Sequence, residues 1–229
     1  MKQFLMTCLV SILSINSLLA QEELSTNSKK DSVIDLKYRE DQFYFGVSHN
    51  IMQDKLKGYS PNSVSLGVDF GFLRDFPINK SRTVAIAPGF GYSYSNLNNN
   101  FGLSAEGNHM VMKEFKHSAL SLHMIDFPLE LRWRTSTFDS HKFWRIYVGI
   151  KASYIVSDKL KTTTNTYTVE LKNDELLNKW IYGTYISVGF NTWNFYTYYG
   201  LNDVYKHNPI ANDPSKLRLL KVGLIFYIL

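Results

Sequence analysis

The chain has 229 residues, of which 45% are hydrophobic, 15% aromatic and 20% charged, and its formal net charge is +5. This composition is too apolar and aromatic for a disordered protein, and the length suits one large domain. The single cysteine excludes a disulfide scaffold and a cysteine-based zinc cluster, and the small, scattered charge excludes a nucleic-acid footprint.

Residues 1–20 have the pattern of a secretory signal peptide. Lys2 precedes an apolar stretch that ends at Ala20, ahead of a polar segment. Serines and an asparagine interrupt the stretch, which disfavours a transmembrane anchor, and it continues past Cys8, which disfavours a lipoprotein signal. Cleavage after Ala20 would remove the only cysteine. Residues 21–41 are polar without a period and predict a flexible periplasmic leader.

From residue 42 the hydrophobic pattern has the period of two that strands require. Between residues 63 and 75, large apolar side chains alternate with serine, glycine and aspartate, and segments 83–95 and 143–154 repeat the scheme. With weaker candidates the pattern predicts eight strands, over residues 42–50, 63–75, 83–95, 118–134, 143–154, 180–190, 195–202 and 216–229. Eight strands are even in number and close a small barrel.

The connections between these strands alternate in length. Long ones span residues 51–62, 96–117, 156–179 and 203–215, and short ones span 76–81, 135–141 and 191–194. Outer-membrane barrels have this alternation, with short periplasmic turns and long extracellular loops. The fold class predicted for residues 42–229 is therefore all-β, an eight-stranded antiparallel up-and-down transmembrane barrel. Both termini would be periplasmic, and four mobile loops would be extracellular.

The two faces of the strands indicate which side meets lipid. In water the outer face of a barrel carries charge, yet here one face is bulky and apolar and the other is mostly serine, glycine and alanine. The bulky face is therefore expected outside, against outer-membrane lipids. Four tryptophans lie near predicted strand ends and predict an aromatic girdle: Trp133, Trp144, Trp180 and Trp193.

Charged residues on the other parity are expected in the lumen. They are Asp69, Glu130, Arg132, Arg134, Arg145, Lys151 and Lys221. Because an eight-stranded barrel is only wide enough for its own side chains, these groups predict a hydrogen-bonded ionic plug rather than an open channel.

The end of the chain, KVGLIFYIL, matches a recognition pattern. It resembles the C-terminal β-signal read by the outer-membrane barrel assembly machinery, with the match at Lys221, Gly223, Phe226 and Ile228. The chain departs from the pattern in ending one residue later, at Leu229. The barrel assembly machinery is thus an expected partner during biogenesis.

A lipid-remodelling enzyme would need an activated nucleophile near the membrane interface. Ser121 and His123 share one strand face, but no acid stands at a fixed spacing, so no catalytic residue is assigned. Leu120 and Leu122 are out of phase with the residues after Met124, which predicts a bulge near His123 or Met124. The six histidines are dispersed, so neither a metal site nor a cofactor site is expected.

Several stretches carry a family resemblance: YREDQFYFGV, TVAIAPGFGYSYS, IDFPLELRWRTST, KFWRIYVG and KVGLIFYIL. Residues 38–229 resemble the outer-membrane β-barrel domain of Bacteroidota, assigned to the porin or PorT family. PorT is an accessory of the type IX protein secretion system. The resemblance implies no catalytic residues.

Three functions remain open. The first is a non-enzymatic barrel that binds or scaffolds secretion-system or envelope proteins through loops 96–117 and 156–179. The second is a passive pore for small solutes. The third is a lipid-remodelling enzyme that uses Ser121 and His123.

Overall fold

The computed structural model describes residues 41–53, 58–61, 63–135, 144–207 and 217–228. The expected signal peptide, all but the last residue of the leader, and Leu229 lie outside these residues. The strands are β1 (Gln42–Gln53), β2 (Leu66–Leu73), β3 (Phe76–Pro77), β4 (Val84–Asn98), β5 (Phe101–Leu103), β6 (His109–Val111), β7 (His117–Arg134), β8 (Trp144–Thr163), β9 (Thr168–Lys172), β10 (Trp180–Phe190), β11 (Trp193–Gly200) and β12 (Arg218–Ile228).

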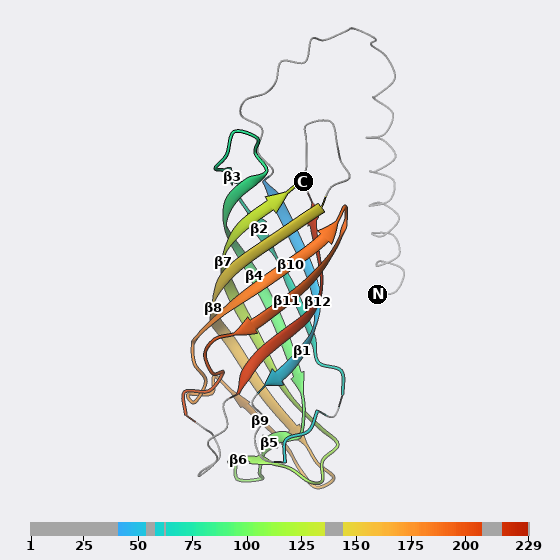
Figure 1. Cartoon of the computed structure of the whole chain (residues 1–229). Helices are drawn as coiled ribbons and strands as arrows, with labels where there is room; N and C mark the ends of the chain where they lie inside the picture. The colour runs from blue at the N-terminus through green and yellow to red at the C-terminus, as the bar shows by residue number, and fades with distance from the viewer. Residues whose placement is uncertain (1–40, 54–57, 62, 136–143, 208–216, 229) are drawn as a thin grey trace, which may run out of the picture. The chain divides into compact units, whose positions relative to one another are not determined.

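Eight of these strands close an antiparallel barrel, as predicted (Figure 1). The hydrogen-bonded order is β1-β2-β4-β7-β8-β10-β11-β12, and β12 pairs with β1 from Phe43–Ile228 to Gln53–Arg218. Closure leaves no unpaired edge within the membrane, where backbone polar groups have no water to bind. In Figure 1 the strands run obliquely between a short-turn end, which carries β3, and a long-loop end, which carries β5, β6 and β9.

Two of the predicted long loops contain strands, and the predicted strand ends at residues 95 and 154 were too early. β4 continues to Asn98, β5 pairs with β6 inside segment 96–117, and β8 continues to Thr163 and pairs with β9 inside segment 156–179. Apolar residues in these segments, such as Leu97 and Leu160, belong to a buried cluster at the long-loop end instead of facing outward. The alternation of outward apolar residues therefore ends before β4 and β8 do, which is why the sequence pattern underestimated their length.

The predicted bulge lies between β7 and β8. His123 is opposite Ser157 and Met124 is opposite Ile155, which leaves Val156 as the extra residue on β8. The reason for the prediction was partly wrong. Leu122 keeps the inward parity of Met124 on an unbroken β7, and the change of phase occurs on β8 instead. Beyond the bulge, the even-numbered residues of β8 are the buried ones.

The outer face is an apolar band bounded by aromatic side chains. On β10, an 11-residue strand, the outward Trp180 is the first residue and the outward Phe190 is the last. Ten steps at roughly 3.4 Å, tilted by about 45°, span roughly 24 Å, close to the roughly 25 Å band of outer-membrane barrels. No helix among the described residues is long and apolar enough to span a bilayer.

Tyrosine rings inside the barrel lie directly on glycines of neighbouring strands. A Cβ added at Gly183 would come within 2.2 Å of the Tyr198 ring, and one at Gly149 within 2.4 Å of the Tyr185 ring. Since any side chain would collide with a ring there, the alternating glycines make room for large aromatic side chains in a narrow lumen. Gly46 differs, because a Cβ there would make only ordinary contacts at 3.5 Å or more.

We predict that Gly183→Ala destabilises the barrel by about 1–3 kcal/mol, the usual cost of overpacking a filled core. Gly46→Ala is the matched control, because it adds the same methyl group to an inward position with room. Urea unfolding in detergent, followed by tryptophan fluorescence, measures both variants. Equal stability of the two would contradict the ring-on-glycine packing.

Candidate functional site: barrel interior and long-loop end

The layer of the lumen nearest the short-turn end is built on two carboxylates and two arginines. Asp75 accepts hydrogen bonds from Arg132 Nη1 at 3.1 Å and from Arg134 at 3.2 and 3.0 Å. Glu130 accepts a hydrogen bond from Arg132 Nε at 2.8 Å. All four side chains are almost fully buried. Bidentate contacts of this kind are among the stronger ion pairs in proteins.

Tyrosines complete this arginine layer. The hydroxyls of Tyr185 and Tyr227 donate to Glu130 Oε1 at 3.0 and 3.2 Å. The guanidinium carbon of Arg132 lies 4.9 Å from the centre of the Tyr147 ring. The two tyrosine hydroxyls thus satisfy Glu130 Oε1, while Arg132 Nε binds the other carboxylate oxygen. The Tyr147 ring offers the Arg132 guanidinium a cation–π contact.

A second layer, further toward the long-loop end, pairs two lysines with two aspartates. Lys151 Nζ lies 3.1 Å from Asp69 and 3.0 Å from Asp126, and Lys221 Nζ lies 3.1 Å from Asp69. Ser153 donates to Asp126 at 2.6 Å. The formal charges of these four ionisable groups cancel. Burial of charge is tolerated only when it is paired in this way.

The lumen between the two layers is nearly full. Its cavity has a volume of about 10 Å³ and is lined by Tyr44, Asp69, Leu73, Pro128, Glu130, Lys151, Tyr185, Tyr196 and Ile225. A volume of that size is about enough for one water molecule. The described residues therefore occupy the space that a solute would need.

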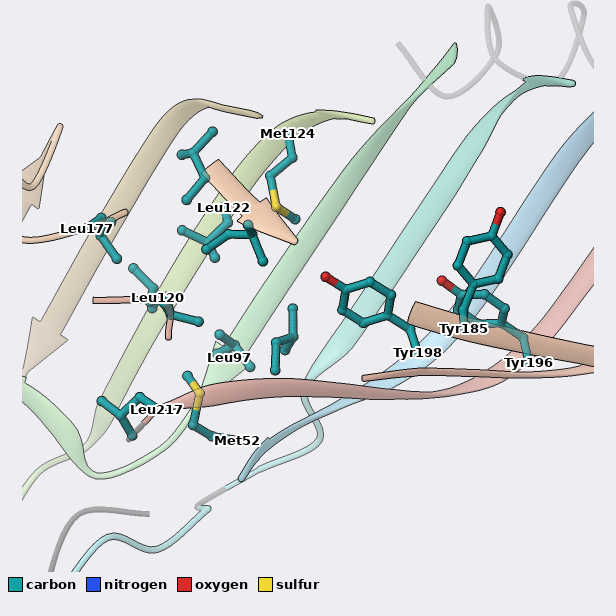
Figure 2. Packing of buried hydrophobic residues seen from close by; sticks show 14 of the residues in the cluster. Met52, Leu97, Leu120, Leu122, Met124, Leu177, Tyr185, Tyr196, Tyr198 and Leu217 are labelled. Carbon is teal, nitrogen blue, oxygen red and sulfur yellow. The ribbon is translucent and has the colours of Figure 1, made fainter. Parts of the chain in front are cut away.

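From the lysine layer toward the long-loop end, the interior becomes apolar and forms a second, apolar plug. Figure 2 shows Tyr185, Tyr196 and Tyr198 on one side and the aliphatic side chains on the other. The plug, as we use the term, consists of the buried residues Met52, Leu97, Phe101, Leu103, Leu120, Leu122, Met124, Ile155, Leu160, Leu177, Val204, Leu217 and Leu219. It closes the barrel at the long-loop end with a core like that of a soluble protein.

The β5–β6 hairpin is fixed to the plug by hydrogen bonds to β7 and β8. Ser118 Oγ donates to the carbonyl of Phe101 at 2.7 Å, and the backbone N–H of Leu103 donates to Thr162 Oγ1 at 3.0 Å. A Cβ at Gly102 would come within 2.5 Å of that same threonine oxygen. The hairpin therefore lies against the inner walls of the two longest strands.

A His–Asp pair joins this hairpin to the β9–β10 connection. His109 Nε2 lies 2.8 Å from Asp174 Oδ2, and both side chains are buried. Burial raises the pKa of Asp174, but hydrogen bonds from His109 and from the backbone N–H of Leu176 outweigh it and hold that pKa below its usual range. The backbone N–H of Asp174 donates to the buried Asp158 at 2.8 Å. The segments at the long-loop end thus form one packed unit.

All seven charged residues expected in the lumen are buried, including Arg145 and Lys221 at 7% and 1% exposure. The structure adds two carboxylates that sequence reasoning missed. Asp126 has the inward parity of Glu130 and could have been found by extending that pattern along β7. Asp75 lies two residues beyond the end of β2 and has the inward parity of Asp69 within the predicted strand 63–75, so the same pattern could have found it.

The four tryptophans are exposed on the outer face, and each lies at or next to a strand end. Trp144 and Trp193 begin β8 and β11 at the short-turn end, and Trp180 begins β10 at the long-loop end. In the C-terminal pattern, Lys221 is buried, Gly223 packs closely against Ser48, and Ile228 is exposed on the outer face, as is part of Phe226.

Ser121 and His123 lie on the outer face of β7, and each contacts a tyrosine of β4. Tyr92 hydroxyl is hydrogen-bonded to His123 Nδ1, and Tyr94 hydroxyl lies 3.3 Å from Ser121 Oγ. No contact joins the serine to the histidine, and none joins a carboxylate to the histidine, among the contacts of the described residues. The described residues also contain no cluster of three metal-ligating side chains.

Comparison with known proteins identifies related sequences and folds. A family model for the outer membrane protein beta-barrel domain matches residues 19–206, and no curated protein matches. Among solved structures, the chain is similar to Ail, the attachment invasion locus protein of Yersinia pestis, crystallised with the heparin analogue sucrose octasulfate. Identity is 10% and the TM-score 0.34, over 82% of this chain and 99% of Ail.

Replacing Asp75 by Asn should destabilise the barrel strongly. Breaking a buried ion pair by removing one partner costs about 3–5 kcal/mol, because the arginines keep their charge without the carboxylate. The control is Asp203→Asn, which removes the charge of a carboxylate that is 33% exposed and 3.4 Å from Arg218, and it should change little. Urea midpoints in detergent test this, and similar midpoints for both variants would refute the role assigned to Asp75.

The His109–Asp174 contact should weaken in acid. Because the folded pKa of Asp174 is depressed, its contribution is complete above the unfolded value of about 3.9 and is lost as pH falls through the folded value. Pepsin cleavage near the β5–β6 hairpin should therefore be several-fold faster in Asp174→Asn than in the parent at pH 4.5. The two rates should converge near pH 2. A ratio of one already at pH 4.5 would contradict this.

Proposed function

Because the chain belongs to the outer membrane protein beta-barrel domain family, we propose that it is a non-enzymatic barrel that binds or scaffolds other envelope proteins at its long-loop end. The observation that carries the proposal is the filled lumen. Two ionic layers, a cavity of about 10 Å³ and the apolar plug follow one another along the barrel. The surface that remains for function is the long-loop end.

The construction of that end supports a binding role. The β5–β6 hairpin, the β8–β9 hairpin and the β9–β10 connection are held together by buried contacts such as His109–Asp174. A rigid surface loses less conformational entropy when it binds a partner than a flexible one does. A pore would not need its long loops packed into a hydrophobic core. This favours binding over passive solute transport.

The chain's route and orientation are part of the proposal. Residues 1–20 would direct export, residues 21–41 would form a periplasmic leader, and both barrel termini would face the periplasm. The long-loop end would then face the outside of the cell. A PorT-like accessory of type IX secretion in Bacteroidota is one specific form of this function, supported by the sequence resemblance of residues 38–229.

The enzymatic alternative has less support. A nucleophilic serine needs a base within hydrogen-bond reach and a group that orients the base. Ser121 and His123 are each engaged with a tyrosine instead. We therefore propose that neither residue is catalytic, and unchanged lipid A mass spectra for Ser121→Ala and His123→Ala would agree with this.

Deleting the gene should change which proteins reach the cell surface or medium if the barrel is a secretion accessory. Quantitative proteomics of secreted and surface fractions, with the intact gene restored as control, measures this. Loss of many unrelated exported proteins is expected for the accessory form, and loss of one or two for a dedicated scaffold. Unchanged fractions, together with steady single-channel conductance of the purified chain in planar bilayers, would overturn the proposal in favour of a pore.

A further inference from the structure

The outer surface next to the apolar band, on its long-loop side, carries a group of charged residues on β8 and β9. This interfacial patch consists of Lys159, Lys161, Glu170 and Lys172, with Ser121 and His123 next to it on β7. Glu170 lies 3.0 Å from Lys159 Nζ and 3.3 Å from Lys161 Nζ. Three lysines minus one glutamate give the patch a formal charge of +2.

The bulge on β8 is what turns these lysines outward. Up to Ile155 the odd-numbered residues of β8 face inward, whereas beyond Val156 the even-numbered residues Asp158 and Leu160 do. Without the extra residue, the lysines would enter the plug, and Asp158 and Leu160 would face lipid. The bulge therefore has two effects: it turns Asp158 and Leu160 into the interior, and it places the lysine charges on the outer surface.

The height of the patch fits the lipid headgroups. The ring of Tyr154 on β8 lies 5.1 Å from the ring of Trp180, centre to centre and tilted by 58°, and this aromatic pair marks the edge of the apolar band. Lys159 stands five residues further along the strand, one of them the bulge residue. Four steps of roughly 3.3 Å at a tilt of about 45° place it roughly 9 Å above the ring pair. The flexible lysine stems can span the remaining difference.

The chemistry of the patch fits a phosphate. Lysine ammonium groups attract phosphate as point charges. The Ser121 hydroxyl and the His123 imidazole, besides their contacts with Tyr94 and Tyr92, have further hydrogen-bonding positions at the same level. Ser121 is opposite Lys159 in the β7–β8 register, and His123 is opposite Ser157. The exposed side chains of Lys159 and Lys161, at 40% and 44%, are open to an approaching headgroup.

We propose that this patch binds the phosphate of an anionic lipid headgroup and so holds a lipid of the surrounding leaflet against β7, β8 and β9. The acyl chains of that lipid would run down the outer face of β8 and β10, past Trp180. The patch lies on the outward side of the β8–β9 hairpin, within the long-loop end proposed to bind proteins. Lipid preference and the set of exported proteins are measured independently, so either proposal can fail without the other. It also gives the Ser121–His123 face a role in lipid contact without catalysis.

Fluorescence quenching at Trp180 tests the proposal. The full chain carrying Trp133→Phe, Trp144→Phe and Trp193→Phe keeps Trp180 as its reporter and serves as the parent. Reconstituted with brominated phosphatidic acid or brominated phosphatidylcholine, the parent should prefer phosphatidic acid at Trp180 by about threefold or more. Raising the salt concentration to about 0.5 M should reduce the preference, because salt screens exposed charges.

The variant Lys159→Gln/Lys161→Gln/Lys172→Gln should lower that preference to about one. The matched control Lys113→Gln/Lys116→Gln/Lys206→Gln loses the same charge from exposed residues at the same end, and it should keep the preference. A Lys→Arg triple variant at the patch should also keep it, which separates loss of charge from misfolding. No preference in the parent, or an equal fall in patch and control variants, would overturn the proposal.

Discussion

The structure depends on the small width of an eight-stranded barrel. Closure of the sheet satisfies the backbone in lipid, but it also forces half of the side chains of each strand into a lumen that only side chains can fill. The rings of Tyr185 and Tyr198 fit because the neighbouring strands offer Gly149 and Gly183. Charged groups are tolerated only in pairs, as with Asp75 and its two arginines. The interior is therefore a packed core with ionic layers in place of a channel.

The extra residue Val156 divides β8 into two parts with different surroundings. On the short-turn side of the bulge, successive side chains of β8 point alternately to the outer face and to the ionic lumen. On its long-loop side, the inward residues Asp158 and Leu160 join a core that resembles that of a soluble domain. The same shift turns Lys159 and Lys161 to the outer surface, where both contact Glu170. One local irregularity thus connects the transmembrane barrel, the packed long-loop end and the charge of the surrounding surface.

A filled lumen moves the question of function to the outside of the molecule. The long-loop end is built like a rigid binding surface, with the β5–β6 hairpin fixed by Ser118 and Thr162 and joined through His109 to Asp174. The outer face is an apolar band with aromatic side chains at both edges, and the interfacial patch lies next to it toward the long-loop end. The patch lies on the outward side of the β8–β9 hairpin, which is itself part of the long-loop end.

The sequence alone determined the eight strands, the parity of each face and seven of the buried lumen charges, because a period of two records which side of a sheet each residue occupies. It did not determine the partners of those charges. Asp75 stands beyond a strand end, and its pairing with Arg132 and Arg134 follows from barrel closure. Nor did it reveal strands β5, β6 and β9, whose apolar residues face a core of their own. Only the tertiary structure decided those contacts, because they join residues distant in sequence, for which a local pattern carries no signal.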